Sequence, residues 1–304
     1  MNNSRKVAGV AGVLSLLWIG LTAAIAASQK RLVFNPNSRR EVANPRSSGH
    51  RTRPIVLRAS DGTKLSGWLM TPQVVGPHPA VVYFGGRSEE VSWVVRDAGK
   101  LFPGMAVLAV NYRGYGNSHG APDEQLMVDD GRLLFDWLRE RHHVDPNRVA
   151  VVGRSLGSGV AVQVALERAV HALVLITPYD SILAIAKRRF RAVPVEYVLR
   201  HRFESVKYAP SLTAPTYVLR AASDDVVPHS HTDILVSKLG RLHLDEIIPD
   251  SDHMNIPYLE LTQARIASFL TQMFSQPHPA QQVPDALSSS DPAHITPVSV
   301  VPLA

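Results

Sequence analysis

The sequence of 304 residues contains no cysteine. This absence excludes disulfide bonds, thiolate metal sites and a thiol nucleophile. It indicates no compartment, because a chain without cysteine tolerates either redox environment. We find no internal repeat. The length and the apolar content of 45% are those of one globular α/β domain of about 250 residues with additional terminal segments.

Acidic residues are nearly absent from the first 53 residues, which contain nine Lys and Arg but a single acid, Glu41. The remaining 251 residues contain 23 Lys and Arg against 25 Asp and Glu. The net charge of +6 therefore belongs to the amino-terminal region, and the body of the protein is close to neutral. A neutral body does not favour nucleic-acid binding, so we expect no nucleic-acid partner.

Charge is also missing from residues 7–27, which follow a short basic amino terminus at residues 1–6. As a helix, 21 residues cross a hydrocarbon core of about 30 Å. We therefore expect a single transmembrane anchor. The alternative is a cleaved secretory signal, with Ala24-Ile25-Ala26 as the cleavage site. The membrane side stays open: the basic residues after the anchor favour a cytoplasmic body, whereas Arg5 and Lys6 also suit an anchor with a cytoplasmic amino terminus.

The rest of the chain divides into a basic linker at residues 28–53, an α/β domain at 54–274 and a disordered tail rich in Pro and Ser at 275–304. Asp61-Gly62 joins two alternating runs and predicts a hairpin. Short apolar runs and amphipathic stretches then alternate, which predicts a mostly parallel sheet with helices on both faces. Strands are expected at 54–59, 64–71, 80–84, 105–111, 149–152, 172–176, 216–219 and 242–248, and helices at 88–101, 123–141, 156–168, 231–239 and 259–274.

Residues 153–157 read Gly-Arg-Ser-Leu-Gly and fit the pattern G-x-S-x-G. The pattern alone is weak, but here a buried strand precedes it and a helix of small residues follows it. Strand, sharp turn and helix form the context of a nucleophile elbow, which exposes the Ser155 hydroxyl at the carboxyl end of the sheet. The alternative is an ordinary strand-to-helix turn.

A serine hydroxyl is a weak nucleophile at neutral pH, so Ser155 needs a base and an acid that orients the base. Among 13 histidines, His253 follows the last expected strand, where a base can reach Ser155. His142 and His143 lie at the polar end of an expected helix, His229 and His231 at the start of another, and His243 within an expected strand. Asp224 follows the strand at 216–219 and is the preferred acid, with its neighbour Asp225 and the earlier Asp180 as the alternatives.

Catalysis of acyl transfer also needs two backbone N–H groups that face the developing oxyanion. The amide of Leu156, directly after Ser155, is one candidate. The second is the amide of Arg87, since Gly85-Gly86 before it let the backbone approach a substrate. The alternative is that these glycines form a flexible turn only.

Five motifs occur in order along the chain: Arg31-Leu32-Val33-Phe34-Asn35-Pro36, Asn111-Tyr112-Arg113-Gly114-Tyr115-Gly116-Asn117-Ser118, Gly153 to Gly157, Asp224 to Pro228, and Asp252-His253. Together they resemble the α/β-hydrolase superfamily, and the nearest group is similar to the Bem46-like and serine-aminopeptidase-like hydrolases that carry a single anchor. The resemblance runs from about residue 30 to 272. It implies Ser155, Asp224 and His253 as the triad and the amides of Arg87 and Leu156 as the oxyanion hole. The family usually has His-Gly where this chain has Gly85-Gly86, and Gly where it has Ala221.

The stretch at about 180–205 is where such enzymes vary their lid. It contains six basic residues and Glu196, and it is either a solvated helix face or a surface for anionic headgroups. The six are Lys187, Arg188, Arg189, Arg191, Arg200 and Arg202.

We therefore expect a membrane-anchored serine hydrolase that cleaves an ester or thioester of a small-molecule or lipid acyl substrate, without a metal or organic cofactor. The alternatives are an acyltransferase or peptidase that uses the same triad, and a non-catalytic scaffold tethered to the membrane. The motifs do not indicate the natural substrate or an oligomeric state.

Overall fold

The computed structural model describes residues 2–36 and 45–277, and its centre is an eight-stranded sheet in the order β1-β2-β4-β3-β5-β6-β7-β8. The first two strands form the predicted hairpin, β2 pairs antiparallel with β4, and all other pairs are parallel. The mostly parallel sheet predicted from the alternating elements is thus confirmed. The strands are β1 (His50–Arg58), β2 (Lys64–Pro72), β3 (His78–Phe84), β4 (Ala106–Val110), β5 (Val144–Arg154), β6 (Leu173–Ile176), β7 (Thr216–Ser223) and β8 (Leu242–Asp252).

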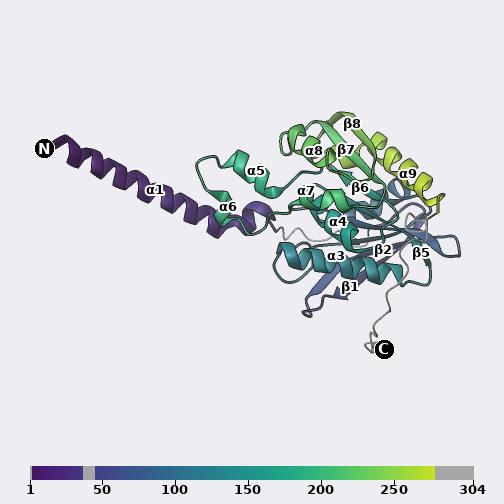
Figure 1. The fold of residues 1–304 in the computed structure, drawn as a ribbon. Coiled ribbons are helices and arrows are strands. Elements are labelled where there is room, and N and C mark those ends of the chain that lie inside the picture. Colours follow the sequence, from purple (N-terminus) through teal and green to yellow (C-terminus); the bar gives the residue numbers. More distant parts are fainter. Residues whose placement is uncertain (1, 37–44, 278–304) are drawn as a thin grey trace, which may run out of the picture.

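Helices cover both faces of this sheet (Figure 1). Successive residues of a buried strand point to opposite faces, so Val81 and Val82 of β3 belong to two different apolar cores. One core lies under α2 (Ser92–Leu101) and α9 (Glu260–Phe274). The other lies under α3 (Glu124–Arg139), α4 (Leu156–Glu167) and α8 (His229–Val236), with the short α7 (Ser205–Tyr208) against α4. Burial on both faces explains why the strands read as continuous apolar runs.

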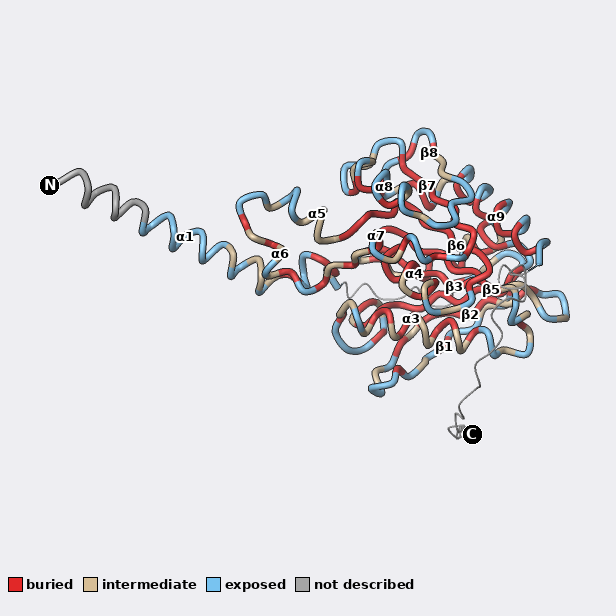
Figure 2. Tube along the Cα trace, viewed as in Figure 1, coloured by how far each residue is buried: buried red, intermediate tan, exposed pale blue. Residues whose placement is uncertain are grey.

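Helix α1 (Asn2–Val33) projects from this body as one unbroken helix of 32 residues, about 48 Å long (Figure 1). Its segment Gly12–Val33 is long and apolar enough to cross a membrane. The exposed stretch of α1 passes into buried residues where the helix reaches the body (Figure 2). The helix does not end at residue 27, because Gln29, Lys30 and Arg31 are good helix formers that end the apolar run without ending the helix.

The predicted linker at 28–53 is consequently shorter than expected. Residues 28–33 belong to α1 and residues 50–53 belong to β1, which pairs with β2 from His50 onward. Residues 37–44 of that linker lie outside the described residues, as do residues 278–304 of the predicted tail.

The stretch at 180–205 forms a cap of two short helices, α5 (Ile182–Arg189) and α6 (Val195–Val198), and α6 lies beside α1 (Figure 1). The Ser181 hydroxyl caps α5 by accepting a hydrogen bond from the Ala184 amide at 2.9 Å. Arg202 turns inward and donates to carbonyl oxygens of the cap. The other five basic residues are exposed and available to solvent or headgroups: Lys187, Arg188, Arg189, Arg191 and Arg200.

Several strands are longer than predicted, β5 among them, and the longer carboxyl ends of β7 and β8 position the site. β7 and β8 continue their pairing past a bulge as far as Ser223 and Asp252, although polar residues there resemble loops. The residues directly after β5, β7 and β8 are therefore Ser155, Asp224 and His253. In contrast, α2 begins at Ser92 rather than at residue 88, because residues 85–91 form a loop beside the site.

Candidate active site

Ser155 lies in the sharp turn between β5 and α4, with φ at 48° and ψ at −116°. A positive φ is strained for a residue with a side chain, and the neighbouring backbone holds it. The Ser155 amide donates to the Ile176 carbonyl at 2.8 Å, and the Ser155 carbonyl accepts from the Ser158 hydroxyl at 2.6 Å. A Cβ on Gly157 would lie 2.2 Å from the Phe84 carbonyl oxygen, so the close approach of α4 to β3 requires glycine there.

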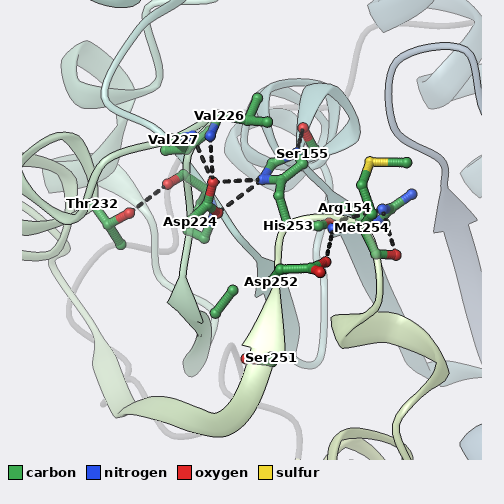
Figure 3. A network of polar contacts seen from close by, with 12 residues as sticks. Arg154, Ser155, Asp224, Val226, Val227, Thr232, Ser251, Asp252, His253 and Met254 are labelled. Carbon is green, nitrogen blue, oxygen red and sulfur yellow. Dashed lines mark hydrogen bonds and ion pairs between the residues drawn. The ribbon is translucent and has the colours of Figure 1, made fainter.

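The structure brings His253 and Asp224 to Ser155 (Figure 3). The Nε2 atom of His253 lies 2.9 Å from the Ser155 Oγ, and its Nδ1 lies 2.8 Å from Oδ2 and 3.0 Å from Oδ1 of Asp224. The Asp224 carboxylate also accepts hydrogen bonds from the amides of Val226 at 2.9 Å and Val227 at 2.7 Å. Hydroxyl, imidazole and carboxylate thus form one hydrogen-bonded series, and the side chains of His253 and Asp224 are nearly buried.

The alternative acids lie elsewhere. Asp180 is buried and accepts hydrogen bonds from the Ser181 amide at 2.6 Å and from Nδ1 of His231 at 2.9 Å. Asp225 is exposed at the cavity that Ser155 lines. Of the other histidines, His229 has its Nε2 2.8 Å from the Ala221 carbonyl oxygen. His243 packs beside Phe269, and the rings of His142 and His143 meet edge to face.

The two predicted oxyanion donors line the same cavity as Ser155. Leu156 is the first residue of α4, a position whose amide has no partner within the helix. Arg87 lies in the loop after β3, and its guanidinium reaches away to the end of α1, where Nε donates to the Leu32 carbonyl at 3.1 Å. The Arg87 side chain therefore attaches this loop to the end of α1.

Glu89, which no sequence motif indicates, holds this loop. Its buried carboxylate accepts four hydrogen bonds: from the Gly86 amide at 2.7 Å, the Tyr83 hydroxyl at 2.8 Å, the Trp93 indole at 2.8 Å and the Arg154 guanidinium at 2.7 Å. Burial, and then the nearby Glu89 carboxylate, raise the pKa of Tyr83 well above its usual value, so the hydroxyl stays protonated and donates. The loop that lacks the usual histidine at Gly85 is thus held by a buried acid.

Arg154, the second residue of the G-x-S-x-G pattern, connects this loop to His253. Burial by itself would lower the pKa of Arg154, but the Glu89 carboxylate raises it, and the guanidinium remains charged. Its Nη2 donates to the His253 carbonyl at 3.0 Å. One buried ion pair therefore links the loop after β3, the turn of Ser155 and the loop that carries His253.

Replacing Arg154 by Met is expected to destabilise the fold by about 3–5 kcal/mol, because it leaves the Glu89 carboxylate buried without its partner. Urea unfolding in detergent measures the loss. Because the two residues share one interaction, Arg154→Met combined with Glu89→Gln should lose less than the sum of the single variants. Strictly additive losses would show that the pair does not act as one unit.

The Asn111–Ser118 motif directly follows β4 and holds the loops around Ser155. The Asn111 Oδ1 accepts from the Val91 amide at 3.1 Å, which holds the end of the loop at residues 85–91. The Arg113 guanidinium donates to both oxygens of the buried Asp130, at 2.6 and 2.8 Å. The Tyr115 hydroxyl donates to the Phe34 carbonyl just after α1. This motif fixes loops around the site and places no further side chain at Ser155.

A cavity of about 560 Å³ opens in front of Ser155 and His253. Most of its lining is apolar, and it comes from three places: the carboxyl end of α1, the cap and the loops at the strand ends. In the part of the chain that the structure describes, no group of three or more His, Asp or Glu is arranged to hold a metal ion. The arrangement can bind an apolar group beside a hydroxyl that a base can deprotonate.

The chain is similar to several known proteins. The family described as serine aminopeptidase S33 matches residues 76–193. An uncharacterised protein of Mycobacterium tuberculosis is 32% identical, over 84% of this chain and 90% of its own length. The lysophosphatidylserine lipase ABHD12 of Danio rerio is 27% identical, over 58% of this chain and 52% of its own.

Among solved structures, Est1E of Butyrivibrio proteoclasticus with bound ferulic acid superposes with a TM-score of 0.62 at 18% identity, covering 73% of this chain and 100% of that one. At this identity the likeness concerns the fold alone. The sheet order, the apolar amino-terminal helix, the family match and the relatives lead to one assignment: the chain belongs to the α/β-hydrolase superfamily, in the group of serine-aminopeptidase-like hydrolases.

Proposed function

We propose that this protein is a membrane-attached serine hydrolase that cleaves acyl esters or thioesters. The observation that carries the proposal is the hydrogen-bonded series from the Ser155 hydroxyl through His253 to Asp224, at the wall of an apolar cavity. The family assignment supports hydrolysis, and the geometry supports these three residues as its catalytic groups.

In the first half of the reaction, the Ser155 Oγ attacks the carbonyl carbon while His253 Nε2 takes the hydroxyl proton. Asp224 keeps the other ring proton on Nδ1 and stabilises the imidazolium that forms. The amides of Leu156 and Arg87 donate to the oxyanion of the tetrahedral intermediate. His253 then gives its proton to the leaving alcohol or thiol, and the acyl group remains on Ser155.

In the second half, a water molecule takes the place of the leaving group. His253 removes a proton from that water, whose oxygen attacks the acyl carbon. The second tetrahedral intermediate collapses, the proton returns to the Ser155 oxygen, and a carboxylic acid leaves. Each step uses the same three side chains, so the site returns to its starting state.

The cavity lining favours an acyl substrate over a peptide with a free amino terminus. Such a peptide carries a cationic amine, and among the described lining residues Asp225 is the single acid besides the positively charged Arg87, Arg154 and Arg189. The apolar majority of the lining suits an acyl chain instead. The relative that is a lysophosphatidylserine lipase and the Est1E structure with ferulic acid are consistent with small-molecule or lipid substrates.

We propose further that α1 anchors the protein as a single pass. Its apolar side chains from Val13 to Leu21 are exposed, most of them by half or more. A hydrocarbon core would remove that surface from water at about 25 cal/mol per Å². Transfer of the helix into a bilayer is therefore favourable.

A panel of substrates tests the proposed reaction. The purified full chain in detergent should hydrolyse p-nitrophenyl acyl esters and acyl thioesters. It should not cleave aminoacyl p-nitroanilides, because three arginines of the described lining outweigh Asp225 and disfavour a cationic amine. Release of nitrophenol, thiol or nitroaniline is followed by absorbance. Cleavage of the anilides in preference to the esters would contradict the proposal and identify a peptidase.

A further inference from the structure

The carboxyl end of α1 is part of the cavity wall. Its lining residues recur at spacings of one, three, four, seven and eight residues, which places them on one face of the helix. They face a cavity that Ser155 and His253 line from the other side. The helix that carries the candidate membrane span thus also encloses the candidate active site. The residues are Ile25, Ala26, Gln29, Leu32 and Val33.

Hydrogen bonds fix α1 in this position. The buried Gln29 accepts from the Arg200 amide at 2.8 Å and donates to the Val198 carbonyl at 3.3 Å, so it pairs with the cap backbone. Farther along the helix, the Trp18 indole donates to the Ala192 carbonyl at 2.5 Å. At the other end, the Arg87 side chain holds the Leu32 carbonyl. The helix is therefore attached both to the cap and to the loop after β3.

The wall opposite α1 is also apolar and belongs to the cap. Ile182, Ile185 and Ala186 of α5 line the cavity, yet no residue of α5 is buried. Val195 and Val198 of α6 continue this lining. The three α5 side chains are half-buried against the protein core, and their remaining surface faces the cavity. Such a surface is stabilised when an apolar group of a ligand covers it.

We propose that residues 25–33 of α1 form the acyl-binding wall of the substrate pocket, with the acyl chain of the ester lying between α1 and α5. The anchor thereby helps to set the chain length that the enzyme accepts. Ala26 is the smallest of the α1 lining residues, so a larger side chain at this position would fill space at this wall. The inference rests on the proposed esterase function and adds a specificity-determining role for the anchor helix.

The test compares Ala26→Trp with Ala24→Trp in the full chain. Ala24 is exposed and lies about 200° around the helix from Ala26, so it controls for adding an indole to α1. Hydrolysis of acetyl and dodecanoyl p-nitrophenyl esters gives kcat/KM for each chain length. The ratio of dodecanoyl to acetyl kcat/KM should fall at least about tenfold in Ala26→Trp, because several methylenes lose their apolar contact, and it should stay at the wild-type value in Ala24→Trp. An equal ratio in all three proteins would overturn the inference.

A crosslinking experiment separates this inference from the proposed function. Full-length Ser155→Ala protein in vesicles that contain a diazirine-tailed fatty acyl ester is irradiated, and the modified peptides are identified by mass spectrometry. Crosslinks in residues 25–33 and in α5 support the acyl wall, and crosslinks confined to other segments overturn it. If the wild type hydrolyses no ester, the proposed function fails, and the crosslink map alone decides the inference.

Discussion

Replacing Ser155 by Ala is expected to lower kcat for ester hydrolysis by about 10⁴- to 10⁶-fold, since removal of the nucleophile removes the acyl-enzyme route and leaves only binding and oxyanion stabilisation. The hydroxyl contacts Nε2 of His253, and the hydrogen bonds that fix the turn come from the backbone of Ser155. The alanine variant would keep those backbone bonds, so it should fold. Initial rates on an acetyl ester, measured beside thermal unfolding, check both statements.

The matched control is Ser230→Ala, which removes a hydroxyl from a position at the start of α8, away from the hydrogen-bonded series of the site. Its turnover should equal that of the wild type. A folded Ser155→Ala variant that retains a tenth or more of the wild-type rate would show that another group performs the reaction.

Replacing Asp224 by Asn is expected to lower kcat by about 10³- to 10⁴-fold through the tautomer of His253. The amides of Val226 and Val227 both donate to Oδ1, so an asparagine would keep its oxygen at that position. Its NH₂ group would then occupy the position of Oδ2, 2.8 Å from Nδ1. A donor there requires an unprotonated Nδ1, which places the ring proton on Nε2, where the ring can no longer accept the proton of Ser155.

The same substitution at the two alternative acids distinguishes the candidates. Asp180→Asn removes the charge that faces His231, and Asp225→Asn removes an exposed charge at the cavity. Each should lower kcat by less than about tenfold, because neither carboxylate contacts His253. A loss at Asp180 or Asp225 as large as that at Asp224 would assign the orienting role to that residue instead.

The parts of the site that sequence patterns could indicate are those fixed by local context. Ser155 sits in a five-residue pattern between a strand and a helix, and His253 and Asp224 follow strands whose carboxyl ends meet at one edge of a parallel sheet. Parallel strands with the same direction bring such residues together whatever their separation along the chain. The hairpin, the parallel sheet and the helices on both faces of the sheet were also predictable, because the periodicity of apolar residues is a local property of the sequence.

Glu89 was not predictable in this way. It lies 65 residues before Arg154 in the chain, and Glu89-Glu90 resembles the solvated start of a helix. The ion pair depends on how the loop after β3 folds over the nucleophile turn, which no spacing in the sequence encodes. A signal was present in Gly85-Gly86: a loop that lacks the usual histidine needs another side chain to hold its amides.

The role of α1 was missed for a different reason. Its cavity-facing residues 25 and 26 belong to a continuous apolar run, and such a run reads as a membrane span whichever protein segments pack against it. The polar Gln29 of α1 is buried against the cap, and it distinguishes the end of α1 that packs on the body from the exposed part. The anchor and the catalytic body were therefore expected as separate units, whereas they share one cavity.

Labelling with a fluorophosphonate probe tests the central claim most directly. A serine oxygen that a base activates displaces fluoride from the probe's phosphorus, and the phosphonyl adduct resembles the tetrahedral intermediate. The folded wild-type chain in detergent should label at one site, identified as Ser155 by peptide mass spectrometry, and Ser155→Ala should not label. A folded wild type that does not label, or that labels at another serine, would contradict the assignment of Ser155, His253 and Asp224 as the catalytic groups.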